Sequence, residues 1–543
     1  MMTTLRRATL GLALAALSAS AAASPADAAS YGNYVAQYYN STKGDAATQA
    51  TAKLIPVTAG STAGGINATL VATGTNSGTA PSTTSPTSST TATTAPSSAA
   101  SSPTWPTSVW SVTRAPDVNS IYGSVTVAKI GGVEAAAFGS DAGQVDVVNV
   151  ATGKELPGWP RVMAGGRGAS IWSTPAIAHL DGPTAPVSII VGAGTNQSTV
   201  GEVEAFYADG RERFVFHVGR QPHTWLGVFS SPAVGDVTGK GQPDIVFGAW
   251  DHELYALTPA GHLVPGFPYD TQDTIWSSPA LYPLPGSHED DIFIGDDASG
   301  LNGCRGGFVD DFHYTAGKPT LRWTHCEGQT IWSSPAIGVI NATRRAAVVV
   351  GTGYGYPPHQ AGSDELYAYY TDNGAPVPGW PVTTDGASAA SPAIGYLGVG
   401  ATPAVVDTAA SANGTEIAAW LGTGRKLWSV HIPAGSPFSL ASPILVPLLN
   451  HRSNDVLVGS RDGLAAIDGR TGEFLYGTGT ALISCVATAT AAVVHVPGLP
   501  PNGGWRVVVP CGSDVVAWPL PVVPLITPAW PMSHQNPEHT GVA

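Results

Sequence analysis

Ile275-Trp276-Ser277-Ser278-Pro279 is the stretch that decides the fold, because the chain returns to it. Close copies stand at 171–175, 228–232 and 331–335, with shorter echoes at 390–392 and 441–443. A phrase that recurs at a nearly fixed interval marks one supersecondary unit that is copied around or along an array. The chain is therefore built from repeats.

Eight repeat units are found when the chain is aligned on the second hydroxyl residue of the phrase. The units are marked by Ser124, Thr174, Ser231, Ser278, Ser334, Ser391, Ser442 and Ser484. Each unit contains four short β-type segments and no helical periodicity, and the clearest apolar-polar alternation is Glu253-Leu254-Tyr255-Ala256-Leu257. This pattern predicts an all-β fold, an eight-bladed β-propeller of four-stranded antiparallel blades. Seven blades is the alternative, because the terminal units are the least regular. The tail at 528–543 is a candidate for the strand that closes the ring.

Composition limits the partners of the protein. The chain has 543 residues, a formal net charge of −14 and only 11% charged residues, with no run of Lys or Arg. Without a basic patch to neutralise phosphates, a nucleic-acid partner is not expected. After the first thirty residues no apolar run is long enough to cross a bilayer, so we expect no membrane span. We expect a monomer.

The chain divides into four parts. Residues 1–29 read as a signal peptide, with Arg6 and Arg7 before an apolar stretch and small residues, and the export route stays open between the general and twin-arginine pathways. This predicts a protein that is secreted, or held near the cell surface. Residues 30–74 are a short segment that resembles the remnant of an immunoglobulin-like module. Residues 75–107 are rich in Ser, Thr, Ala and Pro and predict a disordered linker. The propeller takes up 108–543.

Four cysteines in an exported chain suggest two disulfides. The spacing places Cys304 and Cys326 inside one repeat unit and Cys485 and Cys511 inside another. Neighbouring antiparallel strands bring such positions within reach of each other. We therefore expect the pairs Cys304–Cys326 and Cys485–Cys511.

The third unit carries a family resemblance. Its text, from Ser230-Ser231-Pro232-Ala233-Val234-Gly235-Asp236 to Asp244-Ile245-Val246-Phe247-Gly248, resembles the FG-GAP/VCBS repeats of integrin-α-like propellers. In the seventh unit, Ile467-Asp468-Gly469-Arg470-Thr471-Gly472 is instead similar to a quinoprotein-type, PQQ-like repeat. Both families imply a propeller, but they differ in chemistry.

The FG-GAP resemblance implies a Ca²⁺ loop between the first two strands of a blade. The matching positions here are Asp236, Thr238, Lys240, the carbonyl of Gln242, and Asp244. Calcium sites are built from oxygen ligands, and Lys240 places an ammonium group where one is required. We therefore expect a turn in which Lys240 replaces the ion. No cofactor is expected, and Ca²⁺ at Asp236, Thr238 and Asp244 is the weaker alternative.

The aromatic residues of the phrase are the candidate ligand-binding residues. Trp172, Phe229, Trp276 and Trp332 precede the innermost strand of successive blades, which places them around one mouth of the channel. The integrin resemblance implies a cage for a basic side chain, a cation–π arrangement, and the same rings can stack on sugars. The alternative is that each ring packs between adjacent blades.

Sequence motifs of catalysis are missing from the chain: there is no Gly-x-Ser-x-Gly elbow, no His-Glu-x-x-His helix and no phosphate-binding loop. The sequence therefore favours a secreted, non-catalytic binding or adhesion propeller that recognises an extracellular protein or glycan. The alternative is an enzyme on the same ring, either a carbohydrate-active lyase or glycosidase or a PQQ-dependent dehydrogenase.

Overall fold

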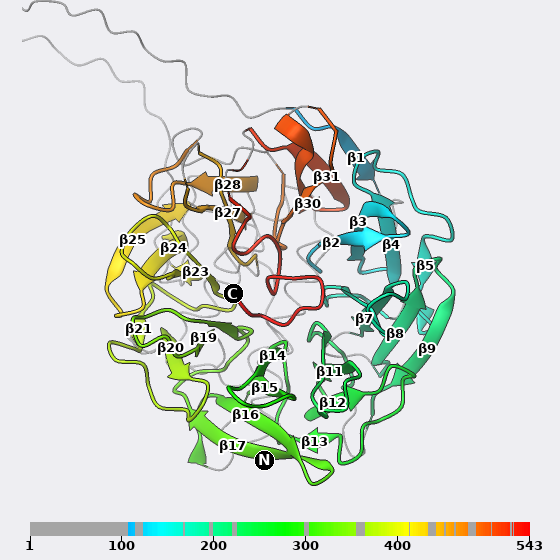
Figure 1. The fold of residues 1–543 in the computed structure, drawn as a ribbon, viewed down its shortest axis with the longest axis horizontal. Helices are drawn as coiled ribbons and strands as arrows, with labels where there is room; N and C mark the ends of the chain where they lie inside the picture. The colour runs from blue at the N-terminus through cyan, green and yellow to red at the C-terminus, as the bar shows by residue number, and fades with distance from the viewer. Residues whose placement is uncertain are drawn as a thin grey trace, which may run out of the picture. The chain divides into compact units, whose positions relative to one another are not determined.

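The computed structural model describes residues 107–543 apart from 114–122, 167–168, 195–198, 220–224, 298–302, 354–363, 412, 433–440, 450–451, 461–462, 476–484, 501, 522–523 and 525. The predicted signal peptide, the 30–74 segment and almost all of the predicted linker lie outside the described residues, so these boundaries stay predictions. Eight antiparallel sheets surround a common centre (Figure 1). The chain is an eight-bladed β-propeller, as predicted, and the seven-bladed alternative is wrong.

The strands follow in chain order from the inside of each blade to its outside. Blades 1 to 4 consist of β2 (Thr126–Ile130), β3 (Val133–Gly139), β4 (Gln144–Asn149) and β5 (Arg161–Val162); β6 (Ala176–Ala178), β7 (Ser188–Ala193), β8 (Glu202–Tyr207) and β9 (Glu212–His217); β10 (Ala233–Gly235), β11 (Asp244–Gly248), β12 (Glu253–Leu257) and β13 (Tyr269–Asp270); and β14 (Ala280–Pro283), β15 (Asp290–Gly295), β16 (Phe308–Thr315) and β17 (Lys318–Cys326).

Blades 5 to 8 continue the series. They consist of β18 (Ala336–Gly338), β19 (Ala347–Gly351), β20 (Glu365–Tyr370) and β21 (Val382–Thr383); β22 (Ala393–Gly395), β23 (Ala404–Ser411), β24 (Gly414–Leu421) and β25 (Lys426–Ile432); β26 (Ile444–Val446), β27 (Asp455–Ser460) and β28 (Gly463–Ile467); and β29 (Ala492–His495), β30 (Trp505–Cys511) and β31 (Asp514–Pro519), with a 3-10 turn at Asn502–Gly504. Among the described residues, blade 7 has three strands.

An N-terminal strand closes the ring. β1 (Trp110–Thr113) pairs antiparallel with β31, with Trp110 opposite Ala517 and Thr113 opposite Asp514, and so becomes the outer strand of blade 8. The prediction that the C-terminal tail is the closing strand is therefore wrong. Sharing one blade between the two ends of the ring removes the open sheet edges that a linear array would leave.

The C-terminal tail lies instead along the inner strands, at the centre of the ring (Figure 1). Its carbonyl groups accept hydrogen bonds from inner-strand N–H groups of six blades, at 2.7 to 3.0 Å. The pairs are Leu445 with Trp530, Val493 with Pro531, Ile177 with Pro537, Val234 with Glu538, Leu281 with Thr540 and Ile337 with Gly541. Innermost strands have no neighbouring strand on their channel side, and buried N–H groups need an acceptor. The tail supplies it.

Each residue of the repeated phrase has a separate structural role. Ile275 packs on Gly248, where a Cβ atom would lie 2.2 Å from the Ile275 side chain, so only glycine fits at the end of that second strand. The first hydroxyl, Ser277, accepts a hydrogen bond from the backbone N–H of Gly295 at 3.2 Å. The second hydroxyl, Ser278, accepts from the N–H of Ser231 in the preceding blade at 2.8 Å.

The second hydroxyls form a closed ring of eight hydrogen bonds, one between each pair of adjacent blades, at 2.8 to 3.2 Å. Around the ring, Ser124, Thr174, Ser231, Ser278, Ser334, Ser391, Ser442 and Thr490 each donate their backbone N–H to the hydroxyl of the next member. Thr490 is the eighth member, so the alignment of the last unit on Ser484 is wrong. The first seven markers are confirmed.

Aromatic residues join the outer parts of adjacent blades. The indole N–H of Trp159 donates to the carbonyl of Ala208 at 3.1 Å, and that of Trp380 donates to Gly422 at 3.1 Å. Both belong to Pro-Gly-Trp-Pro turns, and a Cβ atom on Gly158 would lie 1.9 Å from the carbonyl oxygen of Asp209 in the next blade. The turns therefore act as docking points between blades.

Both predicted disulfides are present. Cys304 and Cys326 are joined with Cα atoms 5.4 Å apart, and Cys485 and Cys511 with Cα atoms 5.3 Å apart. Cys326 ends β17 and Cys511 ends β30. Both bridges lie where second strands turn into third strands and where fourth strands lead to the next blade. We call this side of the ring the loop face.

Candidate ligand-binding face

An aromatic row is the most prominent feature of the loop face. Trp172, Phe229, Trp276 and Trp332 precede β6, β10, β14 and β18, so the structure brings together the four residues predicted from the phrase. Ring centroids are 5.0 Å apart for Trp172 and Phe229, 4.8 Å for Phe229 and Trp276, and 4.3 Å for Trp276 and Trp332. The four aromatic residues, one from each of four successive repeat units, therefore form one continuous cluster.

Stacking covers the ring faces within the row. Phe229 and Trp276 are nearly parallel at 5°, as are Trp276 and Trp332 at 16°, and these three side chains are 6 to 9% exposed. Trp172 meets Phe229 at 66° and is partly exposed at the end of the row. Offset and edge-to-face contacts of this kind stabilise a core by about 0.5–1.5 kcal/mol per pair beyond area burial. Packing between blades is therefore a real role of the row, and ligand binding by these residues stays a prediction.

Two further tryptophans, which are not part of the repeated phrase, extend the row. Trp250 follows β11 and packs 4.8 Å from Trp276 and 5.4 Å from Phe229, and Trp225 lies 6.2 Å from Trp250 and is partly exposed. In the sequence, Trp250 is followed by Asp251 and His252. This grouping of an aromatic residue with an acid and a histidine is the only feature of the sequence that points to Trp250 as part of a site. Trp225 has no repeat equivalent.

Indole N–H groups distinguish this cluster from an ordinary apolar core. The N–H of Trp332 donates to Asp297 at 3.1 Å. Those of Trp250 and Trp276 are buried and have no hydrogen-bond acceptor among the described residues. A buried donor without an acceptor costs about 1–3 kcal/mol.

Acidic residues border the row. Asp297 is buried and also accepts from the hydroxyl of Thr274 at 3.0 Å. Burial raises the pKa of Asp297 well above its ordinary value, and the nearby Asp273 raises it further. The Nε2 atom of His252 lies 3.9 Å from Asp273, and Tyr255 donates to Asp251 at 2.5 Å. The aromatic row thus has a polar border that can donate and accept hydrogen bonds.

The predicted calcium loop lies on the opposite side of the ring, between β10 and β11. Asp236 accepts from the backbone N–H groups of Lys240 and Gly241 at 3.0 and 2.5 Å, and Asp244 accepts from the N–H of Thr238 at 3.1 Å. Burial raises the pKa of Asp244 to about 6. The carboxylates cap the amides of their own loop through backbone N–H groups. The expected ion pair between the Lys240 ammonium and Asp236 or Asp244 is not formed among the described residues. Ca²⁺ at Asp236, Thr238 and Asp244 stays untested.

Within the described ranges, no three His, Cys, Asp or Glu side chains are grouped so as to hold a metal ion. No described helix is long and apolar enough to cross a membrane.

Comparison with known proteins supports the architecture. No family model and no curated protein sequence matches the chain, so the FG-GAP/VCBS resemblance is not confirmed. Among solved structures, Sqt1 of Saccharomyces cerevisiae is 10% identical with a TM-score of 0.50, and the match covers 77% of this chain and 99% of that chain. BamB of Moraxella catarrhalis is 16% identical with a TM-score of 0.48, covering 76% and 97%. Quinohemoprotein alcohol dehydrogenase of Comamonas testosteroni is 14% identical with a TM-score of 0.48, covering 77% and 76%. At 10% identity the likeness to Sqt1 shows similarity of fold alone.

Proposed function

We propose that this protein is an exported binding propeller that recognises an extracellular glycan or protein on its loop face. The observation that carries the proposal is the aromatic row with its unsatisfied indole donors at Trp250 and Trp276 and its partly exposed ends at Trp172 and Trp225. A rigid aromatic surface with a few polar groups at its border is typical of ligand sites.

The position of the tail supports the loop face over the channel. Six inner strands use their channel-side N–H groups to bind the protein's own C-terminal segment. A ligand in the channel would have to replace these contacts, whereas a ligand on the loop face meets rings already held in place by four blades. Binding sites on loops that are supported by a rigid scaffold are common in proteins.

Stacking within the row argues for a glycan over a basic side chain. A cation–π cage needs open ring faces, and the faces of Phe229, Trp276 and Trp332 largely cover one another. The hydroxyl groups of a sugar can donate to carboxylates, and the apolar face of its ring can stack on a partly exposed aromatic ring such as Trp172. The two disulfides are compatible with an extracellular location.

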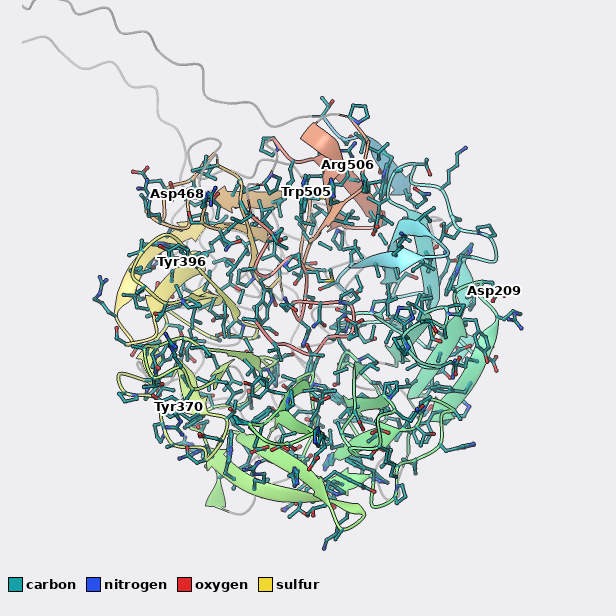
Figure 2. The ribbon with its side chains drawn as sticks, in the orientation of Figure 1. Asp209, Tyr370, Tyr396, Asp468, Trp505 and Arg506 are labelled. Carbon is teal, nitrogen blue, oxygen red and sulfur yellow. A yellow bond between two sulfur atoms is a disulfide. The ribbon has the colours of Figure 1, made fainter. Side chains whose placement is uncertain are left out.

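The test is a glycan array and a pull-down from extracellular milieu, followed by affinity measurements on Trp172→Ala and Trp225→Ala. The control is Tyr396→Ala. Tyr396 is 40% exposed and directly follows β22, on the side away from the loop face, and Figure 2 labels it over blade 6. We expect at least a tenfold loss of affinity in the two tryptophan variants and none in the control. Equal affinity in all three would refute the proposed site.

A further inference from the structure

Four exposed arginines lie on the side of the ring opposite the loop face, where first strands turn into second strands and third strands turn into fourth strands. Arg344 belongs to blade 5, Arg425 to blade 6, and Arg452 and Arg470 to blade 7. None of the four forms an ion pair or a side-chain hydrogen bond with another residue that the structure describes. We call this set the arginine arc.

Contacts between blades join the arc into one surface. In blade 6, a Cβ atom on Gly422, in the turn that carries Arg425, would lie 1.9 Å from the carbonyl oxygen of Ile340. Ile340 belongs to the loop between β18 and β19, which also carries the arginine of blade 5. Toward blade 7, a Cβ atom on Gly398 of blade 6 would lie 3.7 Å from the side chain of Arg470. The arc is therefore continuous over three adjacent blades.

The sequence leaves Arg425 without the partner that its counterpart in blade 2 has. Arg211 and Arg425 hold the same position in turns between third and fourth strands, where each arginine carbonyl accepts a hydrogen bond from the N–H four residues earlier, at 2.8 and 2.9 Å. In blade 2, Asp209 accepts from Nε of Arg211 at 2.8 Å. Thr423 stands at the matching position in blade 6, so the charge of Arg425 is not neutralised within its own turn.

The acidic side chains of blade 7 leave the arc positive as well. Asp468 is 7% exposed, and its carboxylate accepts from the backbone N–H groups of Arg470 and Thr471 at 2.8 and 3.2 Å, which caps the turn. Glu473 is exposed in the same turn. Among the described residues of the turns that form the arc, four exposed and unpaired arginines thus stand against one exposed carboxylate, although the whole chain has a net charge of −14.

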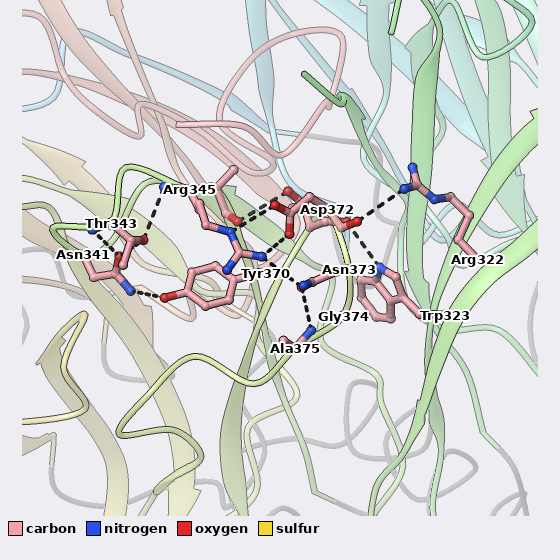
Figure 3. Close-up of polar contacts among 12 residues, drawn as sticks. Arg322, Trp323, Asn341, Thr343, Arg345, Tyr370, Asp372, Asn373, Gly374 and Ala375 are labelled. Atoms are coloured by element: carbon pink, nitrogen blue, oxygen red, sulfur yellow. Dashed lines mark hydrogen bonds and ion pairs between the residues drawn. The ribbon is translucent and has the colours of Figure 1, made fainter. Parts of the chain in front are cut away.

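The arc ends at the seam between blades 4 and 5, where the arginines are already paired. Arg345 donates from Nε to the carboxylate of Asp372 at 3.0 Å and lies 3.8 Å from the centre of the Tyr370 ring (Figure 3). Arg322 donates to the carbonyl of Asp372 at 3.3 Å and to the buried carboxylate of Asp291 at 2.6 Å. The protein itself holds these two guanidinium groups, whereas those of the arc are available to a partner.

We propose that the arginine arc binds an anionic polysaccharide, a sugar chain that carries carboxylate or phosphate groups at intervals. The planar guanidinium group of arginine matches both groups and can donate two hydrogen bonds to one of them. Because the four arginines are spread over three blades, one chain can place a separate acidic group on each. The predicted signal peptide favours a polysaccharide over nucleic acid as the polyanion. The loop face takes no part, so this proposal does not depend on the ligand proposed there.

The experiment measures binding of the full-length protein to immobilised polygalacturonate and phosphorylated dextran, with unmodified dextran as the uncharged chain. The two anionic chains separate carboxylate from phosphate recognition. We expect binding to at least one of them and none to dextran. The double variant Arg425→Gln, Arg470→Gln should lose about tenfold in affinity, because two charge-assisted contacts are removed. Added NaCl should weaken binding of the unaltered protein more than that of the variant, since fewer ion contacts remain to be screened.

The matched control is the double variant Lys154→Gln, Arg211→Gln. It removes the same two charges from exposed positions on the same side of the ring, but in blades 1 and 2, and we expect no change in affinity. Circular dichroism checks that both double variants are folded. The proposal is overturned if the unaltered protein binds neither anionic chain at low ionic strength. It is equally overturned if the two double variants lose the same affinity, because binding would then follow net charge and not the arc.

Discussion

The backbone N–H of Thr490 donates to the hydroxyl of Ser124 at 3.0 Å, although the two residues are 366 positions apart in the chain. This hydrogen bond joins blade 8 to blade 1 and completes the ring of eight hydroxyl contacts. Each hydroxyl is buried or nearly so and accepts from a buried backbone N–H group of its neighbour. The ring therefore couples every blade to the next at the inner wall.

Removing one hydroxyl from the ring should weaken the fold. Ser278→Ala leaves the N–H of Ser231 without its acceptor, and a buried donor of this kind costs about 1–3 kcal/mol. Ser278→Thr keeps the hydroxyl, and Thr174 and Thr490 already occupy equivalent positions, so we expect its stability to stay within about 1 kcal/mol of the unaltered protein. Urea unfolding measures both. Equal stability of the alanine and threonine variants would contradict the role of the ring.

The middle and the end of the aromatic row should respond differently to truncation. Trp276 is 9% exposed and stacked on both sides, so Trp276→Ala should cost about 3–5 kcal/mol of unfolding free energy. Trp172 is partly exposed at the end of the row, and its replacement by Ala should cost clearly less. Thermal or urea unfolding gives both values. A small loss at Trp276 would argue against packing as its main role.

Acid should act on the fold through His534. Burial lowers the pKa of His534 to about 4, whereas in the unfolded chain it is about 6.5. The unfolded chain therefore binds the proton first, and the stability contributed by neutral His534 is complete above about pH 6.5 and falls by about 3 kcal/mol as the pH drops to 4. His534→Asn removes this loss.

The effect of His534 has to be measured as the difference in unfolding free energy between the unaltered protein and His534→Asn, because protonation of buried acids changes the stability in the opposite direction. Burial raises the pKa of Asp407 to about 8, so its protonated folded form gains stability as the pH falls. Urea unfolding of the unaltered protein and of His534→Asn at pH 7 and pH 4 isolates the histidine. A constant difference between the two proteins across this range would rule the effect out.

Calcium should leave the melting temperature unchanged. Asp236 and Asp244 already accept hydrogen bonds from amides of their own loop, and Lys240 adds a positive charge. Thermal melts in millimolar Ca²⁺ and in chelator measure this directly. A rise in Tm with Ca²⁺ that disappears in Asp236→Asn would show an ion site at the loop.

The blade count could be read from the sequence because every blade reuses one packing solution at its inner strand. A hydroxyl at the ring position recurs in every blade, and the glycine that ends a second strand faces Ile171, Ile275 or Ile331 at three of the blade contacts. Thr490 was missed because its surroundings, Ala489 and Ala491, lack the Trp, Ser and Pro that identify the phrase elsewhere. The closing strand β1 was missed because its pairing partner β31 lies at the other end of the ring, and no local pattern reports so distant a contact.

The site was predictable only in part, because only residues that recur in each repeat can be recognised in the sequence. Four members of the aromatic row share a repeat position, whereas Trp225 has none. In blade 4, Glu289, His313 and Arg322 belong to a loop and two strands that come together only through the register of that blade. Spacing along the chain cannot show that His313 turns one nitrogen toward Asp291 and the other toward Glu289.

The pairing of β1 with β31 also governs when the protein can finish folding. Blade 8 needs one strand that is made before blade 1 and three that are made after blade 7, and the tail that fills the centre is made after them. Blades 1 to 7 can assemble from local hairpins, but closure must wait until β31 has been made. We expect the incomplete ring to have an open edge that favours association between nascent chains.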